Sequence, residues 1–172
     1  MQLTGKKPEK LVFEDLIRDY KEKLYWHIRR MVVSHDDADD VLQNTFIKVY
    51  KNLDNFKGES QVYTWLYRIA TNETITFLNK RAKFLKLSNE SLQQTLVSNL
   101  TSDPYFDGDA AQLKLQEAIN LLPPKQKQVF IMKYYEDLQY NEIAEVLNTS
   151  EGALKASYHH AVKKITQHVL NN

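Results

Sequence analysis

One stretch near the C-terminal end of the 172-residue chain limits its fold more than any other feature. Residues 121–165 are expected to form a helix and then two further helices, which a tight corner at residues 148–150 joins. A short helix, a three-residue turn and a longer helix with a polar outer face are typical of a helix-turn-helix, whose second helix enters the major groove of DNA. The last helix carries an apolar seam, spaced to face the core, at Leu154, Tyr158, Ala161, Ile165 and Val169.

The composition limits the class of protein further. Four glycines and four prolines leave few helix breakers, so an all-α chain of long helices is expected. The absence of cysteine excludes disulfides and thiolate metal sites. No apolar run approaches the roughly 20 residues that a membrane span needs, and the N-terminus lacks the apolar core of a signal peptide. We therefore predict a cytoplasmic protein with no direct membrane insertion.

Charge is segregated along the chain, although its formal net value is only +1. Residues 68–86 carry five basic side chains against the single acid Glu73, whereas residues 34–40 carry four aspartates. A nucleic-acid binder needs a basic footprint, and the distribution of charge matters more than its sum. The two segments therefore predict two surfaces for two different partners.

Three helices are predicted in the N-terminal half. The first ends near Val33, and Ser34 then caps a second helix over residues 36–53, whose first turn holds the aspartates. The acidic cluster has two interpretations: capping with solvation, or binding of a hard cation, although its spacing matches no calcium loop. The second helix is expected to bury Ala38, Val41, Leu42, Phe46, Val49 and Tyr50.

The third predicted helix, over residues 62–83, combines basic, aromatic and amide side chains. Cations bind phosphate, aromatic rings stack on bases and amides bind base edges, a combination that suits single-stranded or partly melted nucleic acid. Trp65 and Tyr67 have an alternative interpretation as core residues. The side chains expected to face the nucleic acid include Arg68, Asn72, Asn79, Lys80 and Arg81.

Residues 84–110 lose the helical pattern and are rich in Ser, Asn, Gln and Thr. We predict a flexible linker that holds at most a short helical turn, because so long a connection is unusual inside one compact domain. The chain then divides into a flexible N-terminus (1–10), a three- or four-helix domain (11–83), the linker and a helix-turn-helix domain (111–172). Fully extended, the linker reaches on the order of 80 Å.

Catalytic chemistry is not predicted. The five histidines have no metal-protease spacing, and neither a phosphate-binding glycine loop nor a nucleophile–base set is visible. The carboxylates are interpreted as solvated or capping. The chain is therefore expected to be no enzyme and to need no cofactor or metal.

Two long segments resemble one known family. Bacterial sigma factors of the extracytoplasmic-function group have a region 2 that is similar to DADDVLQNTFIKVYKNLDNFKGESQVYTWLYRIATNETITFLNKR. Their region 4 is similar to LPPKQKQVFIMKYYEDLQYNEIAEVLNTSEGALKASYHHAVKKI. The order of the two segments and the linker between them match as well. The resemblance implies an alternative sigma factor of the sigma-70 family, which binds core RNA polymerase and directs promoter-specific transcription initiation.

In region 2 the resemblance implies docking on the β′ clamp helices of the polymerase through Asp39, Asp40, Gln43 and Asn44. Family members usually have Glu where Asn44 stands, so charge pairing there is expected to be weaker. The loop over residues 56–62 resembles one that captures a flipped base of the −10 element, and flipping costs a few kcal/mol of unstacking. The implied −10 contacts are Lys57, Glu59, Ser60, Trp65, Arg68, Asn72, Asn79, Lys80 and Arg81.

In region 4 the resemblance implies a reader of the −35 element and a contact with the β flap of the polymerase. Ser157, His160 and Val162 replace positions that are often basic in the family. Each lost phosphate contact flattens the salt dependence of binding by roughly one unit of slope, so isolated region 4 should bind DNA weakly and rely on tethering by polymerase. The implied −35 contacts are Ser150, Glu151, Gly152, Lys155, Ala156, His159 and Lys163.

Other interpretations stay open at this point. A helix-turn-helix regulator with a sensing or dimerising N-terminal domain predicts a ligand pocket or a self-complementary surface in residues 11–83. An antagonist that mimics the two domains predicts an acidic helix over residues 68–86, where the chain is basic. The resemblance also implies an anti-sigma factor as a partner. A closed arrangement, in which the two domains pack on each other without a partner, is a further possibility.

Overall fold

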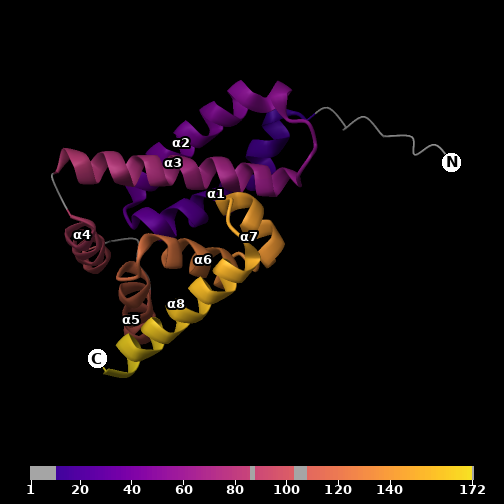
Figure 1. Cartoon of the computed structure of the whole chain (residues 1–172). Coiled ribbons are helices and arrows are strands. Elements are labelled where there is room, and N and C mark those ends of the chain that lie inside the picture. The colour runs from indigo at the N-terminus through magenta and orange to yellow at the C-terminus, as the bar shows by residue number, and fades with distance from the viewer. Residues whose placement is uncertain (1–10, 86–87, 103–107, 172) are drawn as a thin grey trace.

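The computed structural model describes residues 11–85, 88–102 and 108–171, and the predicted flexible N-terminus therefore lies outside the described residues. The described residues form helices and no strand, as the sequence predicts. The elements, shown in Figure 1, are α1 (Phe13–Val32), α2 (His35–Asn52), the 3-10 turn η1 (Leu53–Asn55), α3 (Val62–Phe84), α4 (Asn89–Thr101), α5 (Ala110–Asn120), α6 (Pro124–Tyr134), α7 (Tyr140–Leu147) and α8 (Glu151–Asn171).

Helices α1 to α3 pack together as the predicted N-terminal bundle. The apolar stripe of α1 is buried, with Leu24 and Ile28 fully inaccessible to solvent. Ser34 caps α2, because its hydroxyl accepts a hydrogen bond from the backbone N–H of Asp37 over 3.4 Å. Asp36 and Asp37 lie in the first turn of α2, where the helix dipole favours negative charge. Capping thus accounts for part of the acidic cluster.

Helices α5 to α8 form the C-terminal half, and its helix-turn-helix is confirmed as α7, a turn and α8. Asn148 ends α7 in the left-handed backbone conformation, with a φ of 49°, which Asn tolerates better than most residues. The predicted seam of α8 faces inward, and Leu154, Ala161 and Ile165 are buried. Pro124 begins α6, where its missing N–H has no helical partner to lose.

The predicted linker differs from expectation, because it contains the 13-residue helix α4. Ser88 caps this helix by accepting from the backbone N–H of Ser91 over 3.1 Å. Leu96 and Leu100 are buried, and they form a small apolar cluster with Val33 that also contacts Leu113. The linker is therefore not an extended chain. Part of it folds because its few leucines, spaced by four residues, find an apolar surface at the end of α1.

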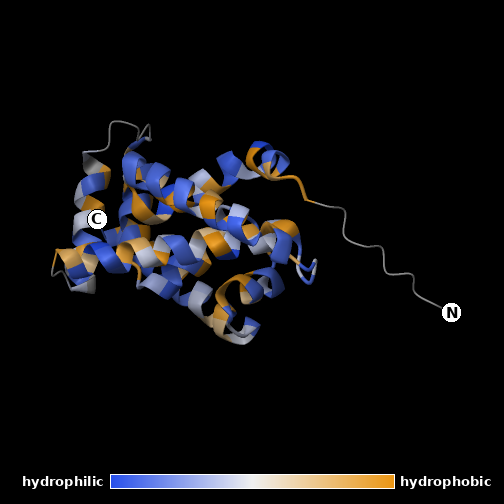
Figure 2. Ribbon diagram, turned by 90° about the horizontal axis from the view of Figure 1, so that it is seen from above, coloured by the Kyte–Doolittle hydropathy of each residue, from blue (hydrophilic) through white to orange (hydrophobic). Residues whose placement is uncertain are grey.

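The two halves are not separate bodies, because one apolar core runs through both. It includes Leu24 and Leu66 from the N-terminal bundle together with Met132, Ile143 and Leu154 from the C-terminal half. Helix α3 contacts α7, and α1 contacts α6, so that the C-terminal helices lie against one side of the bundle (Figure 1). Figure 2 shows hydrophobic and hydrophilic residues interleaved along the helices, as expected for helices that bury one side. We call this packing of α6–α8 on α1 and α3 the closed arrangement.

Two tyrosines bear on the sequence expectation. Tyr50, predicted to be buried, is 66% exposed, because Val49 takes the inward position at the end of α2 while Tyr50 contacts the ring of Phe13. Tyr67, for which the sequence left a nucleic-acid face and the core open, is 5% exposed and therefore belongs to the core. The reason is that α3 is covered on two sides, by the N-terminal bundle and by the C-terminal half.

A buried lysine joins the halves at the end of α1. Lys127, on α6, donates hydrogen bonds to the backbone carbonyl of Met31 over 3.0 Å and to Oδ1 of Asn120 over 2.7 Å. Burial disfavours the charged form and lowers the pKa of Lys127 to about 7. The unfolded chain therefore binds a proton more readily than the folded chain does between about pH 7 and 10.5.

Because the lysine pKa is lower in the folded state, the free energy of unfolding should rise with pH above about 7. Chemical denaturation between pH 7 and 9 should show this rise in the natural protein. The variant Lys127→Met, which keeps most of the side-chain volume and has no titrating amine, should show a smaller rise over the same interval. Equal slopes for the two proteins would contradict a depressed lysine pKa.

Candidate functional site

The outward face of α2 carries the residues predicted to dock on polymerase. Asp40, Gln43 and Asn44 are exposed, and Asp39 is partly exposed with its Oδ2 at 3.5 Å from Nε2 of His35. The same face continues one turn further to Ile47, which is 51% exposed. The structure thus brings the four predicted residues together, beside an apolar side chain that the sequence reasoning did not include.

The loop before α3 and the first turns of α3 enclose a hollow of about 460 Å³. The rings of Phe56 and Trp65 lie in this hollow with their centroids 4.9 Å apart. Trp65 is partly exposed, so it belongs to the core and to the surface at once. Five of the predicted −10 residues line this one hollow, namely Lys57, Glu59, Ser60, Trp65 and Arg68.

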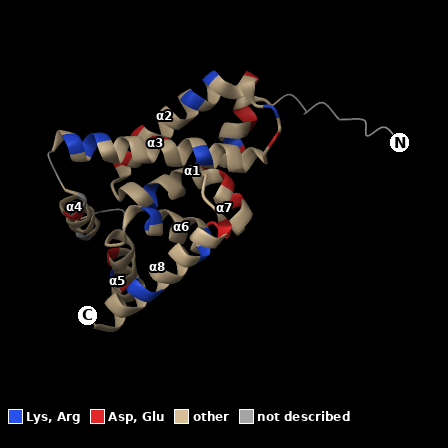
Figure 3. Ribbon diagram, in the orientation of Figure 1, with Lys and Arg blue, Asp and Glu red and all other residues tan. Residues whose placement is uncertain are grey.

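The remaining predicted −10 residues lie further along α3. Asn72 follows Arg68 by four residues and shares its side of the helix. Asn79 and Lys80 are exposed near the C-terminal end of α3, where basic residues gather in Figure 3. A helix rises 1.5 Å per residue, so Asn79 is roughly 20 Å from Trp65 along the axis.

Arg81 lies on the other side of α3 and has a partner within the protein. Its guanidinium forms an ion pair with Asp37 at the start of α2 and stands over the ring of Phe77. Both charged side chains are largely shielded from solvent, with 30% and 20% of their surface exposed. The pair therefore ties the end of α3 to the beginning of α2, whatever else Arg81 contacts.

The outer face of α8 is accessible over its whole N-terminal half. Ser150 caps the helix by accepting from the backbone N–H of Ala153 over 3.4 Å. Lys155 stands 3.8 Å from Glu151 and above the ring of Tyr140. All the predicted −35 residues are exposed, namely Ser150, Glu151, Gly152, Lys155, Ala156, His159 and Lys163.

The closed arrangement places α7 beside part of the α3 side that carries predicted −10 residues. A second hollow, of about 940 Å³, lies between α3 and α6–α8, with Arg68 and Asn72 on one wall and Ser157 on the other. The guanidinium Nε of Arg68 donates to the backbone carbonyl of Glu145, on α7, over 3.1 Å. Glu145 also lines the smaller hollow beside Trp65. Helix α7 therefore occupies space next to the residues predicted to bind the −10 strand.

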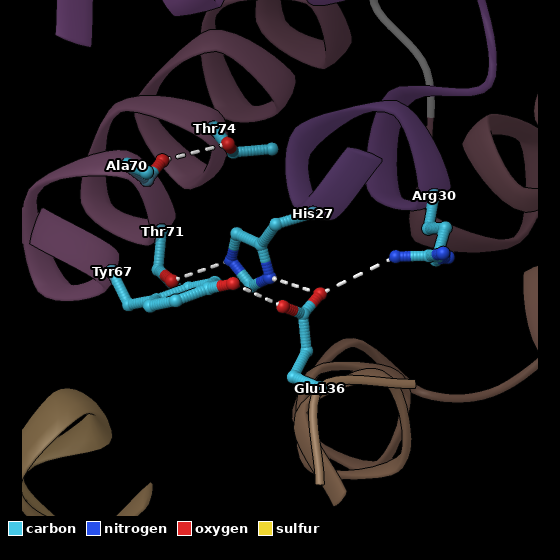
Figure 4. A network of polar contacts seen from close by, with 7 residues as sticks. All are labelled: His27, Arg30, Tyr67, Ala70, Thr71, Thr74 and Glu136. Atoms are coloured by element: carbon cyan, nitrogen blue, oxygen red, sulfur yellow. Dashed lines mark hydrogen bonds and ion pairs between the residues drawn. The ribbon is translucent and has the colours of Figure 1, made fainter. Parts of the chain in front are cut away.

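A buried polar network crosses between the two halves (Figure 4). Glu136, in the turn after α6, accepts a hydrogen bond from the hydroxyl of Tyr67 and lies 3.3 Å from Nδ1 of His27. Arg30 stands 3.5 Å from the same carboxylate, and Thr71 Oγ1 is 2.9 Å from Nε2 of His27. The expectation that the carboxylates are solvated or capping is therefore wrong for Glu136, whose side chain is 5% exposed.

The network also shifts the pKa values of Glu136 and Tyr67. Burial would raise the pKa of Glu136, but hydrogen bonds and charge from His27, the Tyr67 hydroxyl and Arg30 together outweigh it, so the pKa lies below its ordinary value. Burial and the neighbouring carboxylate raise the pKa of Tyr67. Glu136 is therefore ionised and Tyr67 neutral at neutral pH.

Sequence reasoning passed over both His27 and Glu136. His27 follows Leu24 by three residues and precedes Met31 by four, which places it on the apolar stripe of α1. A polar residue on such a stripe needs a buried partner, and this signal was present in the sequence. No local pattern identifies the partner, because Glu136 lies 109 residues further along the chain.

Within the described ranges, no group of three histidine, aspartate or glutamate side chains is placed to hold a metal ion. None of the described helices is both long and apolar enough to cross a membrane.

A helical bundle joined to a helix-turn-helix with an open outer face defines a DNA-binding protein with more than one interaction surface. Residues 16–84 match the family model for sigma-70 region 2, and residues 112–165 match the model for sigma-70, region 4. The chain is 35% identical to the ECF RNA polymerase sigma factor SigW of Bacillus subtilis over 162 residues, which cover 90% of this chain and 87% of the relative.

Further comparisons agree. The chain is 28% identical to the RNA polymerase sigma factor SigV of Bacillus subtilis, over 94% of this chain and 93% of the relative. The sigma factor RpoE of Bartonella quintana, solved in complex with the anti-sigma factor NepR, has a similar fold. The TM-score is 0.71 at 19% identity, over 91% of this chain and 96% of that one.

The chain therefore belongs to the sigma-70 family of RNA polymerase sigma factors, in its extracytoplasmic-function group. Its function is that of an alternative sigma factor, which directs transcription initiation. Sigma factors are not a class of enzymes. The alternative of a regulator with a sensing or dimerising N-terminal domain is not supported, because region 2 of the family accounts for that part of the chain.

The pair between Asp37 and Arg81 should contribute to the stability of the N-terminal bundle. Removing the guanidinium in Arg81→Ala should lower the free energy of unfolding by about 1 kcal/mol, because it leaves a largely shielded carboxylate without its partner. The matched control Asn79→Ala, on the exposed side of the same helix, should change it much less. Chemical denaturation measures both. Equal stabilities would contradict a structural role for Arg81.

Proposed function

We propose that the chain docks on core RNA polymerase through the outward face of α2 and reads a promoter with two further surfaces. Residues 11–83 act as region 2, with the loop over residues 56–62 and α3 binding and melting the −10 element. Residues 111–172 act as region 4, with α8 reading the −35 element. Residues 84–110 connect the two.

The main support for the proposal is that the α2 face is exposed to solvent, whereas part of the proposed −10 surface lies against α7. In the closed arrangement Asp40, Gln43 and Asn44 are exposed, whereas Arg68 and the hollow beside Trp65 lie against α7. Polymerase can therefore reach α2 while α7 still lies against Arg68 and the hollow beside Trp65. The proposal is that docking on polymerase comes first and −10 binding follows, after α7 has moved away.

The hollow before α3 has the chemistry that a flipped base needs. The rings of Phe56 and Trp65 offer stacking surfaces, and base–aromatic stacking is worth about 1–3 kcal/mol per base. Lys57 and Arg68 supply cations for the adjacent phosphates. Ser60 offers a hydroxyl that can pair with a base edge. Together these interactions offset the few kcal/mol that unstacking costs.

Helix α8 is suited to reading a duplex but supplies few cations. Lys155 and Lys163 are exposed on its outer side, whereas Ser157 lines the hollow that faces α3. A small number of phosphate contacts gives weak independent binding that falls gently with salt. Docking on polymerase supplies the remaining affinity, because a tethered module binds at a high effective concentration.

The proposal extends to compartment and partners. The chain acts in the cytoplasm, where polymerase and DNA are, and has no catalytic activity or cofactor of its own. The β′ clamp helices and the β flap are the proposed polymerase contacts. An anti-sigma factor is a further proposed partner, by analogy with the Bartonella quintana protein that was solved with NepR.

Transcription in vitro tests the function as a whole. The purified chain is added to core RNA polymerase from Bacillus subtilis, the source of two relatives, with a library of promoter sequences. New transcripts that start at a shared sequence pattern are expected. The proposal fails if the chain neither associates with the core enzyme nor changes the set of transcripts.

Asp40→Arg should abolish association with core polymerase while the helical content stays unchanged, because it reverses the charge on an exposed position of α2. Co-purification with tagged core enzyme measures the effect. Asp54→Arg, on an exposed position of the turn after α2, makes the same charge change as a control and should bind normally. Normal binding by both variants would remove α2 from the interface.

Lys155→Glu should lower transcription from promoters that depend on a −35 element by about tenfold, because it replaces a major-groove cation by an acid. The neighbouring Glu151 adds only a weak like-charge pair, so the helix should still form. Gln167→Glu, exposed near the end of α8, adds a negative charge away from the turn and serves as control. Runoff transcription compares them, and unchanged promoter preference in Lys155→Glu would argue against α8 as the reader.

A further inference from the structure

Among the described residues, the partners of the Glu136 carboxylate all come from the other half of the molecule. Its hydrogen-bond and ion-pair partners are His27 and Arg30 on α1 and Tyr67 on α3 (Figure 4). Glu136 itself belongs to the turn between α6 and α7. The contact therefore exists only in the closed arrangement, and separation of the halves must break all of it.

The chemistry of the network suits a contact that forms and breaks. An ionised carboxylate only accepts, so Nδ1 of His27 is the donor to Glu136 and its ring orientation is fixed by Thr71 on the other nitrogen. Water replaces these donors when the halves separate, so the net gain from the closed contact is modest. Loss of one partner in the closed state costs much more, because the remaining buried groups are left unpaired.

The same contact positions the helix that covers the −10 surface. Glu136 precedes α7 by four residues, and Glu145 on α7 accepts the hydrogen bond of Arg68. Tyr67, which donates to Glu136, is the neighbour of Arg68 in the chain. Helix α7, which carries acidic residues in Figure 3, contacts α3. Closure at Glu136 therefore places α7 over Arg68.

We propose that Glu136 is the latch of a self-inhibited state: its carboxylate holds the closed arrangement, and release of this contact uncovers the −10 surface. The inference rests on the proposed function of α3 as the −10 surface. It adds a regulatory role for residues that touch neither polymerase nor DNA. Any partner that pulls the C-terminal half away from α1 and α3 would act by breaking this latch.

Förster resonance energy transfer between dyes on the two halves tests the latch without DNA or polymerase. The chain has no cysteine, so Thr76→Cys on α3 and Asn141→Cys on α7, both at exposed positions, give one specific pair of dye sites. Glu136→Gln keeps the shape of the side chain and removes its charge. Tyr67→Phe removes the donor from the opposite side. Asp137→Asn is the matched control, because it is adjacent, 93% exposed and makes the same charge change.

Both latch variants should lower the transfer efficiency, and the double variant should add little, because the two residues act on one contact. The control should match the natural protein, and circular dichroism should show the same helical content in all. Binding to a labelled random-sequence single-stranded DNA 20-mer should tighten by about tenfold in Glu136→Gln, because apparent affinity scales with the fraction of open molecules.

Unchanged transfer efficiency in Glu136→Gln, beside normal transcription with core polymerase, would overturn the latch alone. A lower transfer efficiency without tighter binding of the 20-mer would overturn its inhibitory role. If neither the natural protein nor any variant bound single-stranded DNA or supported transcription, the proposed function would fail, and the regulatory role with it.

Discussion

A single interface between α1–α3 and α6–α8, which we call the seam, holds the molecule together, and α3 lies at its centre. One side of α3 packs on α1 and α2, and another side meets α7, so that Leu66 and Ile143 belong to the same apolar core. The seam also buries charge: Glu136 and Lys127 each reach across it to groups of the N-terminal bundle. Apolar contacts give such a seam its strength, and the buried polar contacts favour the closed placement of the two halves because separation would break them.

This seam decides which surfaces of the protein are available. The face of α2 with Asp40 and Asn44 is open, and so is the outer face of α8 with Lys155. The side of α3 with Arg68 lies against α7. Under the proposed function, α7 therefore lies beside part of the −10 surface when the free protein meets polymerase. Aromatic and basic side chains bind single-stranded nucleic acid without strict sequence preference, and we propose that this partial cover reduces binding away from promoters.

Helices and their caps could be predicted from the sequence, because local patterns determine them. The stripe of α1 and the seam of α8 follow helical periodicity, and Ser34 and Ser150 act as helix caps where a small polar residue precedes a periodic run. Contacts between distant segments could not be derived in this way. The sequence left Tyr67 open between the surface and the core, because nothing in its neighbourhood shows that α7 lies over it.

The linker shows a different limit of sequence reasoning. Its composition is typical of a disordered connection, and only Leu96 and Leu100 distinguish α4 within it. Those leucines gain from folding only because Val33 offers them a partner in the closed arrangement. Helix α4 is therefore expected to be a property of the whole fold rather than of its own sequence.

Small-angle X-ray scattering shows directly whether the free protein is one compact body. A compact chain of this length has a radius of gyration of about 16 Å. A value close to this is expected for the free protein in dilute solution, with the profile of a single body. A clearly larger radius, with the profile of two bodies joined by a linker, would contradict it.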